Sequence, residues 1–412
     1  MSIEIRTIDP AETSAWFVSL MTGFLERSDP DAIAAEVLPL WDHRRVWGAF
    51  EGGTVVGTLR SWATELTLPG GARVPGGAVA GVTVRPTHRR QGILSRMMAA
   101  EHAAARDRGE AVALLYASEY PIYGRHGYGP AVPLAVWTVA SGQTRLRGEA
   151  RPGAVDIVPA SVVSRDSIRG VFEQWRVRQP GEIRRREFSW DDDLALRTRS
   201  WGQPWNGFVA LHRDAAGAVD GYVRYHVDEK WERRQPAHLL HVDELHALTD
   251  EAYADLWRFV IEMDLVATVR AERRSPSERM PWLLTNARAA VASDTGDGMW
   301  LALLDTSKVL ATRNYLVSGA VVLEVRPPTG SPGADAERLL LDVTPDGATC
   351  LPTQRSPDLT LSVGALATAC LGGARLRDAV LMHGVDEHLP GTLARADLLF
   401  RAAETPWSST FF

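Results

Sequence analysis

The sequence predicts an α/β chain of three domains, in which two domains share one strand–helix–strand order and the third is a smaller α+β unit. A chain of 412 residues is long enough for about two to four domains. A strand, a turn and a helix around residues 79–108 are echoed, with altered chemistry, around residues 239–270. We place the domains at residues 1–140, 154–300 and 304–412, with a linker between the first two.

The first domain contains the most informative segment, which begins at Val79 and ends at Met98. It predicts a strand, a basic turn containing Arg89 and Arg90, and a helix that starts at Gly92. Free N–H groups and the helix dipole make such a start an anion site. Glycine lets a phosphate approach the backbone, and arginine adds charge-assisted contacts. The pattern favours a pyrophosphate cradle, and its alternative is a solvated basic turn before an ordinary helix.

Other phosphate-binding motifs do not occur in this sequence. There is no Gly-x-x-x-x-Gly-Lys-Ser/Thr, so a P-loop site is not supported. There is no Gly-x-Gly-x-x-Gly either, which argues against a Rossmann dinucleotide site. The basic turn therefore needs a different pyrophosphate ligand.

The segment after the basic turn continues the expected order of an acetyl-CoA site. The helix should end near Arg108, where Gly109 suits the position after a helix end. An apolar strand over residues 112–117 and a turn-rich segment over residues 118–130 follow. The turn-rich segment holds four candidate proton donors or acceptors: Tyr120, Tyr123, Tyr128 and His126. The sequence alone does not rank the three tyrosines. The alternative for each tyrosine is a packed aromatic ring, and for His126 a surface or capping group.

The second domain repeats the order without the basic turn. A strand over residues 239–248 precedes a helix capped by Thr249, and Asp250 and Glu251 stand where the first copy has arginines. Because acidic groups repel a pyrophosphate, we expect no CoA in this copy. His241 and His246 lie near two acids, Asp243 and Glu244, but odd separations in a strand point to opposite faces, so we expect no metal.

The third domain and the overall composition narrow the function classes. Strands near residues 317–325, 338–343 and 359–363 and a helix from 363 to about 371 show no obvious nucleophile or metal set. Two cysteines are too few for a disulfide framework, which suits the cytoplasm, and the start is charged and unlike a signal peptide. No apolar run approaches about 20 residues, so no membrane span is expected. A net charge of −6 disfavours nucleic acid.

The motifs resemble one enzyme family. Arg89-x-x-Gly92-x-Leu94 is similar to the acetyl-CoA loop of GNAT acyltransferases, although Leu94 replaces a small residue. Residues 81–98, residues 117–130 and the aromatic end of the chain resemble the Eis (enhanced intracellular survival) N-acetyltransferases. The resemblance implies tandem GNAT folds, the second degenerate, and a C-terminal domain similar to sterol carrier protein. It also implies a homohexamer that acetylates amines of aminoglycosides and other polyamines, with acetyl-CoA as co-substrate and no metal.

The resemblance also assigns roles to individual residues. Tyr123 would be the general acid, and the α-carboxylate of Phe412 the general base. The residues expected to bind acetyl-CoA are Val82, Thr83, Val84, Arg89, Arg90, Gln91, Gly92, Ile93, Leu94, Ser95, Ser118 and Glu119. Two departures concern the acceptor: Tyr116 stands where a histidine is expected, and residues 21–24 lack an acid that helps line the aminoglycoside pocket.

Two alternatives to a small-molecule acetyltransferase remain open at this point. One is an acetyltransferase for protein lysines or N-termini, which an open acceptor cleft would favour. The other is a non-enzymatic carrier that senses CoA and binds an apolar ligand in the third domain, which requires a sizeable apolar pocket there.

Overall fold

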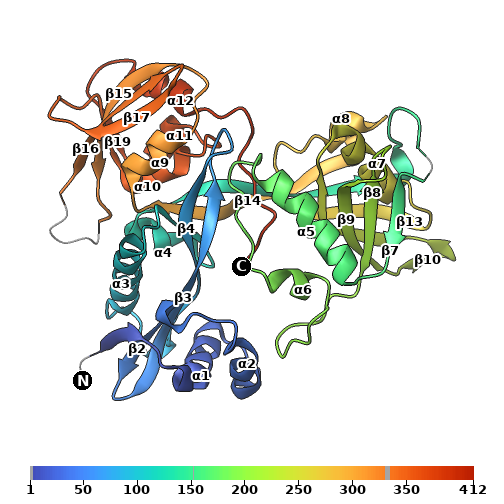
Figure 1. The fold of residues 1–412 in the computed structure, drawn as a ribbon, viewed down its shortest axis with the longest axis horizontal. Coiled ribbons are helices and arrows are strands. Elements are labelled where there is room, and N and C mark those ends of the chain that lie inside the picture. Colours follow the sequence, from blue (N-terminus) through green and yellow to red (C-terminus); the bar gives the residue numbers. More distant parts are fainter. Residues whose placement is uncertain (1–2, 152, 330–334) are drawn as a thin grey trace.

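The protein is built around one continuous mixed sheet with a smaller domain attached to it (Figure 1). The computed structural model describes residues 3–151, 153–329 and 335–412. Twelve strands hydrogen-bond in the order β1-β2-β3-β4-β5-β14-β6-β13-β12-β9-β8-β7, and five strands of the smaller domain in the order β17-β16-β15-β18-β19. The expected α/β class, with a separate α+β unit near the C-terminus, is confirmed.

The first half of the large sheet is formed by the N-terminal segment. Its elements are β1 (Glu4–Thr7), η1 (Pro10–Glu12), α1 (Thr13–Phe24), α2 (Pro30–Val37), η2 (His43–Arg45), β2 (Val46–Glu51), β3 (Thr54–Thr67), β4 (Arg73–Val84), η3 (Pro86–His88), α3 (Ile93–Asp107), β5 (Val112–Tyr116), α4 (Tyr120–Tyr123), η4 (Gly124–His126), β6 (Tyr128–Ala140) and η5 (Ser141–Gln143).

Helix α3 has the sequence pattern that its position requires. Ile93, Met97, Ala100 and Ala104 fall on one face at helical spacing; Ile93 and Met97 are buried against the sheet, and the two alanines are half-buried. The helix ends at Asp107, and Gly109 adopts a φ of 77° just beyond it. The helix expected to follow the basic turn is therefore confirmed.

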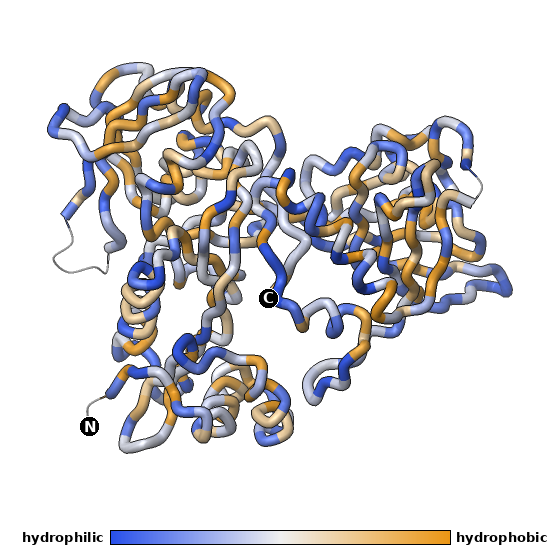
Figure 2. The backbone as a smooth tube through the Cα atoms, in the orientation of Figure 1, coloured by the Kyte–Doolittle hydropathy of each residue, from blue (hydrophilic) through white to orange (hydrophobic). Residues whose placement is uncertain are grey.

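The second half contains the echo of this order. Its elements are β7 (Val155–Val158), α5 (Val162–Arg176), α6 (Ser189–Asp193), β8 (Phe208–Arg213), β9 (Val219–Asp228), β10 (Trp231–Glu232), β11 (Gln235–Pro236), β12 (His238–Ala247), α7 (Asp250–Ile261), β13 (Val266–Arg274), α8 (Met280–Leu283), η6 (Ala287–Ala289) and β14 (Ala290–Leu303). Thr249 caps α7 by accepting a hydrogen bond from the N–H of Ala252 at 3.1 Å, as expected. In Figure 2 the strands inside this half are mostly hydrophobic and its outer loops hydrophilic.

The two halves exchange strands at their junction. Strand β14, the last of the second half, pairs with both β5 and β6 of the first. Strand β6 pairs in turn with β13. Because β14 fills the gap between β5 and β6, the sheet of the first half is complete only when residues beyond 290 are in place.

The third domain packs its own sheet around a buried helix. Its elements are α9 (Thr306–Thr312), β15 (Gly319–Arg326), β16 (Glu337–Thr344), β17 (Gly347–Pro352), β18 (Leu359–Ser362), α10 (Val363–Ala369), α11 (Leu376–His383), β19 (Val385–Glu387) and α12 (Thr392–Phe400). Every residue of α10 is buried, and Cys350 and Cys370 are buried free thiols. Among the described residues, no helix combines the length and the apolar character needed to cross a bilayer.

The C-terminal tail leaves the third domain after α12 and runs back between the two halves of the large sheet, where the chain ends (Figure 1). Trp407 anchors it to the second half: its backbone N–H donates to the carbonyl oxygen of Pro180 at 2.9 Å. Its indole Nε1 donates to the carbonyl oxygen of Arg273 at 2.7 Å. The fold thus carries the final residues from the third domain to the first.

Candidate active site

A cavity of about 570 Å³ lies where β4 and β5 diverge and α3 begins. The two strands pair only over residues 76–78 and 112–114, although each continues beyond that point. The cavity is lined by Gly23, Phe24, Leu25, Val82, Thr83, Val84, His88, Arg89, Arg90, Gly92, Ile93, Leu94, Ser95, Ser118, Glu119, Ile122, Tyr123, Arg125 and His126. All residues expected to bind acetyl-CoA line it except Gln91, which is exposed on the same turn.

The basic turn has the backbone of an anion-binding loop. Arg90 and Gly92 have φ values of 64° and 74°, so the N–H groups of the turn do not follow a helix or strand pattern. A Cβ on Gly92 would meet no atom within 4 Å, so glycine is favoured here by its φ and not by crowding. The side chains of Arg89 and Arg90 are exposed, and neither has a recorded side-chain partner within the described residues. They are therefore free to contact phosphates.

Strand β4 is distorted beside this cavity. Gly81 has a φ of 63°, and the β3–β4 register shifts at this point, so the strand contains a bulge here. The hydroxyl of Thr58 donates to the carbonyl oxygen of Gly81 at 2.8 Å and holds the bulge. Helix α1 approaches so closely that a Cβ on Gly23 would lie 1.8 Å from Oγ1 of Thr83. This close approach places the end of α1 in the wall of the cavity.

The structure distinguishes the three tyrosines that the sequence left unranked. Tyr128 is fully buried, and its hydroxyl is hydrogen-bonded to Nε2 of His102 at 2.9 Å. Tyr120 is 48% exposed and packs against Trp300. Tyr123 lines the cavity, and burial, reinforced by the charge of Glu119, raises its pKa to about 12. Tyr123 thus keeps its hydrogen across the physiological pH range.

His126 is a buried histidine in the same wall, not a surface group. Burial, followed by the charge of Arg125, lowers its pKa to about 4. Its Nε2 atom is buried without a protein hydrogen-bond partner. A ring with this pKa is neutral at pH 7 and is a weak general base.

A second cavity, of about 620 Å³, adjoins the first across the end of β5. Both cavities are lined by Phe24, Val82, Ser118 and Tyr123. The second is also lined by Phe411 and Phe412, and it extends to residues of both halves, including Asp192 and Arg197. Tyr123 and the C-terminal residue therefore border one cavity, on the far side of the diverging strands from the basic turn.

A buried network fixes the tail at this cavity. The carboxylate of Glu182, which has no exposed surface, accepts hydrogen bonds from Oγ of Ser408 at 2.9 Å and from N–H of Ser409 at 2.7 Å. The hydroxyl of Tyr116 donates to the carbonyl oxygen of Thr410 at 2.6 Å. Tyr116, at the position where a histidine was expected, therefore holds the tail.

The last side chain packs among aromatic rings. The ring of Phe412 lies 5.1 Å from those of Trp62 and Tyr116, each in an edge-to-face arrangement. Within the described part of the chain, the α-carboxylate of Phe412 has no recorded hydrogen bond or ion pair. It is thus free to interact with a bound ligand.

The second cavity combines acids with two guanidinium groups that lack carboxylate partners in the described chain. Arg60 and Arg186 both lie over the ring of Trp62, at 4.8 and 4.1 Å from its centroid. Burial, reinforced by the charge of Arg186, lowers the pKa of Arg60 to about 9, which means that the surroundings of Arg60 disfavour its charged form. The acids of the cavity wall are Glu26, Glu36, Asp192 and Asp297.

Two of these acids are already paired, because Arg197 contacts Glu36 at 3.0 Å and Asp192 at 2.6 Å. None of these acidic or basic residues belongs to a recognisable sequence motif, because they come from distant segments and meet only in the folded protein.

The corresponding cleft of the second half is narrowed by the C-terminal tail, which forms part of the wall of a cavity of about 440 Å³. Strands β12 and β13 diverge as β4 and β5 do, but Trp407 packs there, 5.7 Å from the ring of His246 and 4.5 Å from the guanidinium of Arg274. Asp250 and Glu251 at the start of α7 are paired with Arg279 and Arg151. The second copy thus presents acids and a tail where the first presents an open basic turn.

Comparison with known proteins agrees with this arrangement. Residues 4–131 and residues 181–301 match two different family models, each described as an acetyltransferase (GNAT) domain, and residues 306–409 match a sterol carrier protein domain. The sequence is 39% identical to an uncharacterized N-acetyltransferase of Streptomyces griseus over the whole length of both chains. It is 32% identical to the N-acetyltransferase Eis of Mycobacterium tuberculosis, over 88% of this chain and 87% of that protein.

A solved structure is similar over nearly its whole length as well. Eis1 from Mycobacterium abscessus superposes with a TM-score of 0.84 at 30% identity, covering 99% of this chain and 100% of that one. Fold and site together define a GNAT acetyltransferase that uses acetyl-CoA as its acyl donor. The chain belongs to the Eis family of N-acetyltransferases.

Proposed function

We propose that this N-acetyltransferase moves an acetyl group from acetyl-CoA, held in the cavity at the basic turn, to a primary amine in the adjoining cavity. The observation that carries this proposal is that Tyr123 borders both cavities while Phe412 borders the second. The residues that would hold the pyrophosphate are those of the turn around Arg89, Arg90 and Gly92.

In this mechanism the nitrogen of the neutral amine attacks the thioester carbonyl and a C–N bond forms. An alkylamine with a pKa of about 10 is neutral in roughly one molecule per thousand at pH 7, a deficit of about 4 kcal/mol. The carboxylate of Phe412 accepts the proton that the amine loses, directly or through water. A backbone N–H at the Gly81 bulge polarises the carbonyl oxygen.

The tetrahedral intermediate then collapses with cleavage of the C–S bond. The leaving sulfur takes the proton of the Tyr123 hydroxyl, which solvent replaces, so the products are the N-acetylated amine and CoA with a free thiol. With a pKa of about 12, Tyr123 retains this proton until the sulfur develops negative charge.

Replacing Tyr123 with Phe tests this role without changing the packing of the ring. We expect kcat to fall about 10²–10⁴-fold, the usual contribution of general acid catalysis, with little change in acetyl-CoA affinity. Tyr120→Phe is the matched control, because Tyr120 lies in the same turn but does not line either of these cavities. A Tyr123→Phe enzyme with the kcat of the parent would remove Tyr123 from the mechanism.

For the acceptor, we propose aminoglycosides and other polyamines, the class that the family resemblance implies. The acids of the second cavity support a cationic acceptor, whereas Arg60 and Arg186 oppose a dense polycation. The test is incubation with acetyl-CoA and a panel of aminoglycosides, linear polyamines, amino acids and lysine peptides, followed by mass spectrometry of the products. Acetylation of the peptides alone would favour a protein acetyltransferase instead.

Assembly and location complete the proposal. We propose a homohexamer in the cytoplasm, in agreement with the family resemblance and with two buried free thiols. Light scattering of the purified chain tests the hexamer directly. A lipid-carrier role gains no support from the cavity between α11 and α12, because that cavity is bordered by charged residues such as Arg375, Asp378 and Asp397.

A further inference from the structure

Two histidines and an aspartate cluster on the sheet of the second half, and none of them lines either cavity described above. The tetrapeptide His-Val-Asp-Glu occurs twice, beginning at His226 in β9 and at His241 in β12. These strands are antiparallel neighbours, and their register places His226 directly opposite His241. Asp228, two residues after His226, lies on the same face of the sheet.

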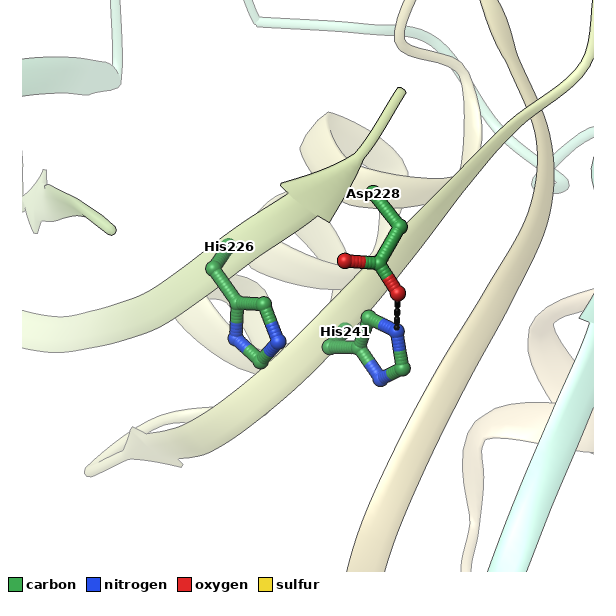
Figure 3. Close-up of side chains that lie close together, drawn as sticks. All are labelled: His226, Asp228 and His241. Atoms are coloured by element: carbon green, nitrogen blue, oxygen red, sulfur yellow. Dashed lines mark hydrogen bonds and ion pairs between the residues drawn. The ribbon is translucent and has the colours of Figure 1, made fainter. Parts of the chain in front are cut away.

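The three side chains turn toward one another (Figure 3). The imidazole rings of His226 and His241 are parallel, with their centroids 4.5 Å apart. Nε2 of His241 is hydrogen-bonded to Oδ2 of Asp228 at 2.9 Å. One nitrogen of each ring and one carboxylate oxygen all lie within 4.8 Å of one another. Cross-strand pairing therefore brings together groups that no single strand could supply.

A second carboxylate orients the cluster from outside. Nδ1 of His226 is hydrogen-bonded to Oδ1 of Asp243 at 2.8 Å. The other oxygen of Asp243 accepts a hydrogen bond from Nε1 of Trp205 at 2.8 Å. With its Nδ1 hydrogen engaged in this way, His226 presents the lone pair of Nε2 toward His241. Metal-binding histidines commonly donate their second N–H to a carboxylate in this manner.

We propose that His226, Asp228 and His241 bind a divalent transition-metal ion, of which zinc fits the donor set best. Imidazole nitrogen and carboxylate oxygen are standard zinc ligands at about 2.0–2.2 Å, which places neighbouring ligands roughly 3.3 Å apart. Donor atoms that lie within 4.8 Å of one another reach that spacing by closing up by at most about 1.5 Å. The ion takes the place of the hydrogen on Nε2 of His241, and the neutral ring then carries its hydrogen on Nδ1.

The site opens to solvent on one side. The side chains of His226 and Asp228 are 37% and 67% exposed, so an ion can enter without unfolding the sheet. Three protein ligands leave a fourth position of a tetrahedral ion for water or for a donor from another molecule. Ligands from β9 and β12 make the bound ion a crosslink between two strands of the second half.

Titration of the tag-free full-length protein with zinc chloride, after chelator treatment and dialysis, tests the proposal. Calorimetry should show one saturable site per chain with a dissociation constant in the micromolar range or below. His226→Ala and His241→Ala should each weaken binding at least tenfold. His43→Gln should leave it unchanged, because the His43 side chain is hydrogen-bonded only to Thr13 among the described residues and lies in another part of the chain. Absence of a 1:1 site, or equal affinity in the variants, would overturn the proposal.

A more conservative variant tests the site even if the histidine variants do not fold. Asp228→Asn changes an exposed side chain that contributes to no core, so its fold is secure, and we expect at least tenfold weaker zinc binding. Asp243→Asn should weaken binding about 10–100-fold through the orientation of His226. Cobalt(II) in place of zinc should give the visible absorption of a tetrahedral site in the parent protein and lose it in Asp228→Asn. An unchanged cobalt spectrum in that variant would also refute the assignment.

Discussion

Adding one glycine after Phe412 tests the role of the chain terminus more directly than any substitution. The added residue moves the negative group by about 3.5 Å and leaves a neutral amide in its former place. The tail contacts of residues 407–410 do not involve the α-carboxylate, so the tail should remain anchored. The acceptor cavity of about 620 Å³ has room for the extra residue.

The expected loss follows from the protonation state of the acceptor. At pH 7 the neutral amine is roughly a thousandfold scarce, and a general base contributes about 10²–10⁴-fold. We therefore expect kcat/KM to fall about 10²–10³-fold at pH 7. The deficit should shrink toward pH 10, where the amine loses its proton in bulk water. Tyr123, with a pKa of about 12, stays protonated over this whole range, so its ionisation does not change the dependence of kcat/KM on pH.

The assay is continuous detection of the CoA thiol from pH 6.5 to 10, with an N-terminally extended protein as control. Acetyl-CoA affinity should be the same in both proteins, because Phe412 does not line the cofactor cavity. Parent activity in the C-terminally extended protein would refute the reasoning. A loss of equal size at every pH would refute it as well, since that result indicates a blocked cavity and not a missing base.

Three further predictions concern the cofactor, the tail and the acid range. Arg89→Ala and Arg90→Ala should each weaken acetyl-CoA binding by about 1.5–3 kcal/mol in a titration, without changing the melting temperature. Glu182→Ala should lower kcat at least tenfold while acetyl-CoA affinity stays constant, because three hydrogen bonds to the tail are lost. Burial lowers the pKa of His102 to about 3 and of His126 to about 4, so the unfolded chain binds protons that the folded chain excludes. The free energy of unfolding should therefore be fully retained above pH 6.5 and fall by a few kcal/mol toward pH 4, and denaturant titrations of His126→Gln should show a smaller fall.

Local chemistry explains why much of the cofactor cavity could be predicted from the sequence. The basic turn, the glycine at the start of α3 and the tyrosine-bearing segment lie within residues 81–130, so the order strand, basic turn, helix and strand can be predicted from neighbouring residues. The individual acetyl-CoA-binding residues were expected from the family resemblance. Helix α3 was predictable for the same reason, since its buried residues recur at helical spacing. Features that depend on sequence neighbours are visible in the sequence.

The acceptor cavity could not be predicted in this way, because its wall is assembled across the chain. Arg60, Arg186 and Phe412 come from three distant segments and meet around Trp62. The same limit applies to His241. On its own strand only Asp243 lies at the cluster, and His226 and Asp228 become neighbours of His241 only through the pairing of β9 with β12.

The anchored tail makes the proposed mechanism sensitive to any change near Phe412. With Phe412 as the base, the acetyl-CoA cavity can be complete while the proton acceptor is still missing, because Phe412 borders only the second cavity. An exopeptidase that removes Phe412 would then remove the proposed base, since the new terminal carboxylate at Phe411 ends about 3.5 Å short. The network around Glu182 then also protects activity, because it holds the preceding residues in buried hydrogen bonds.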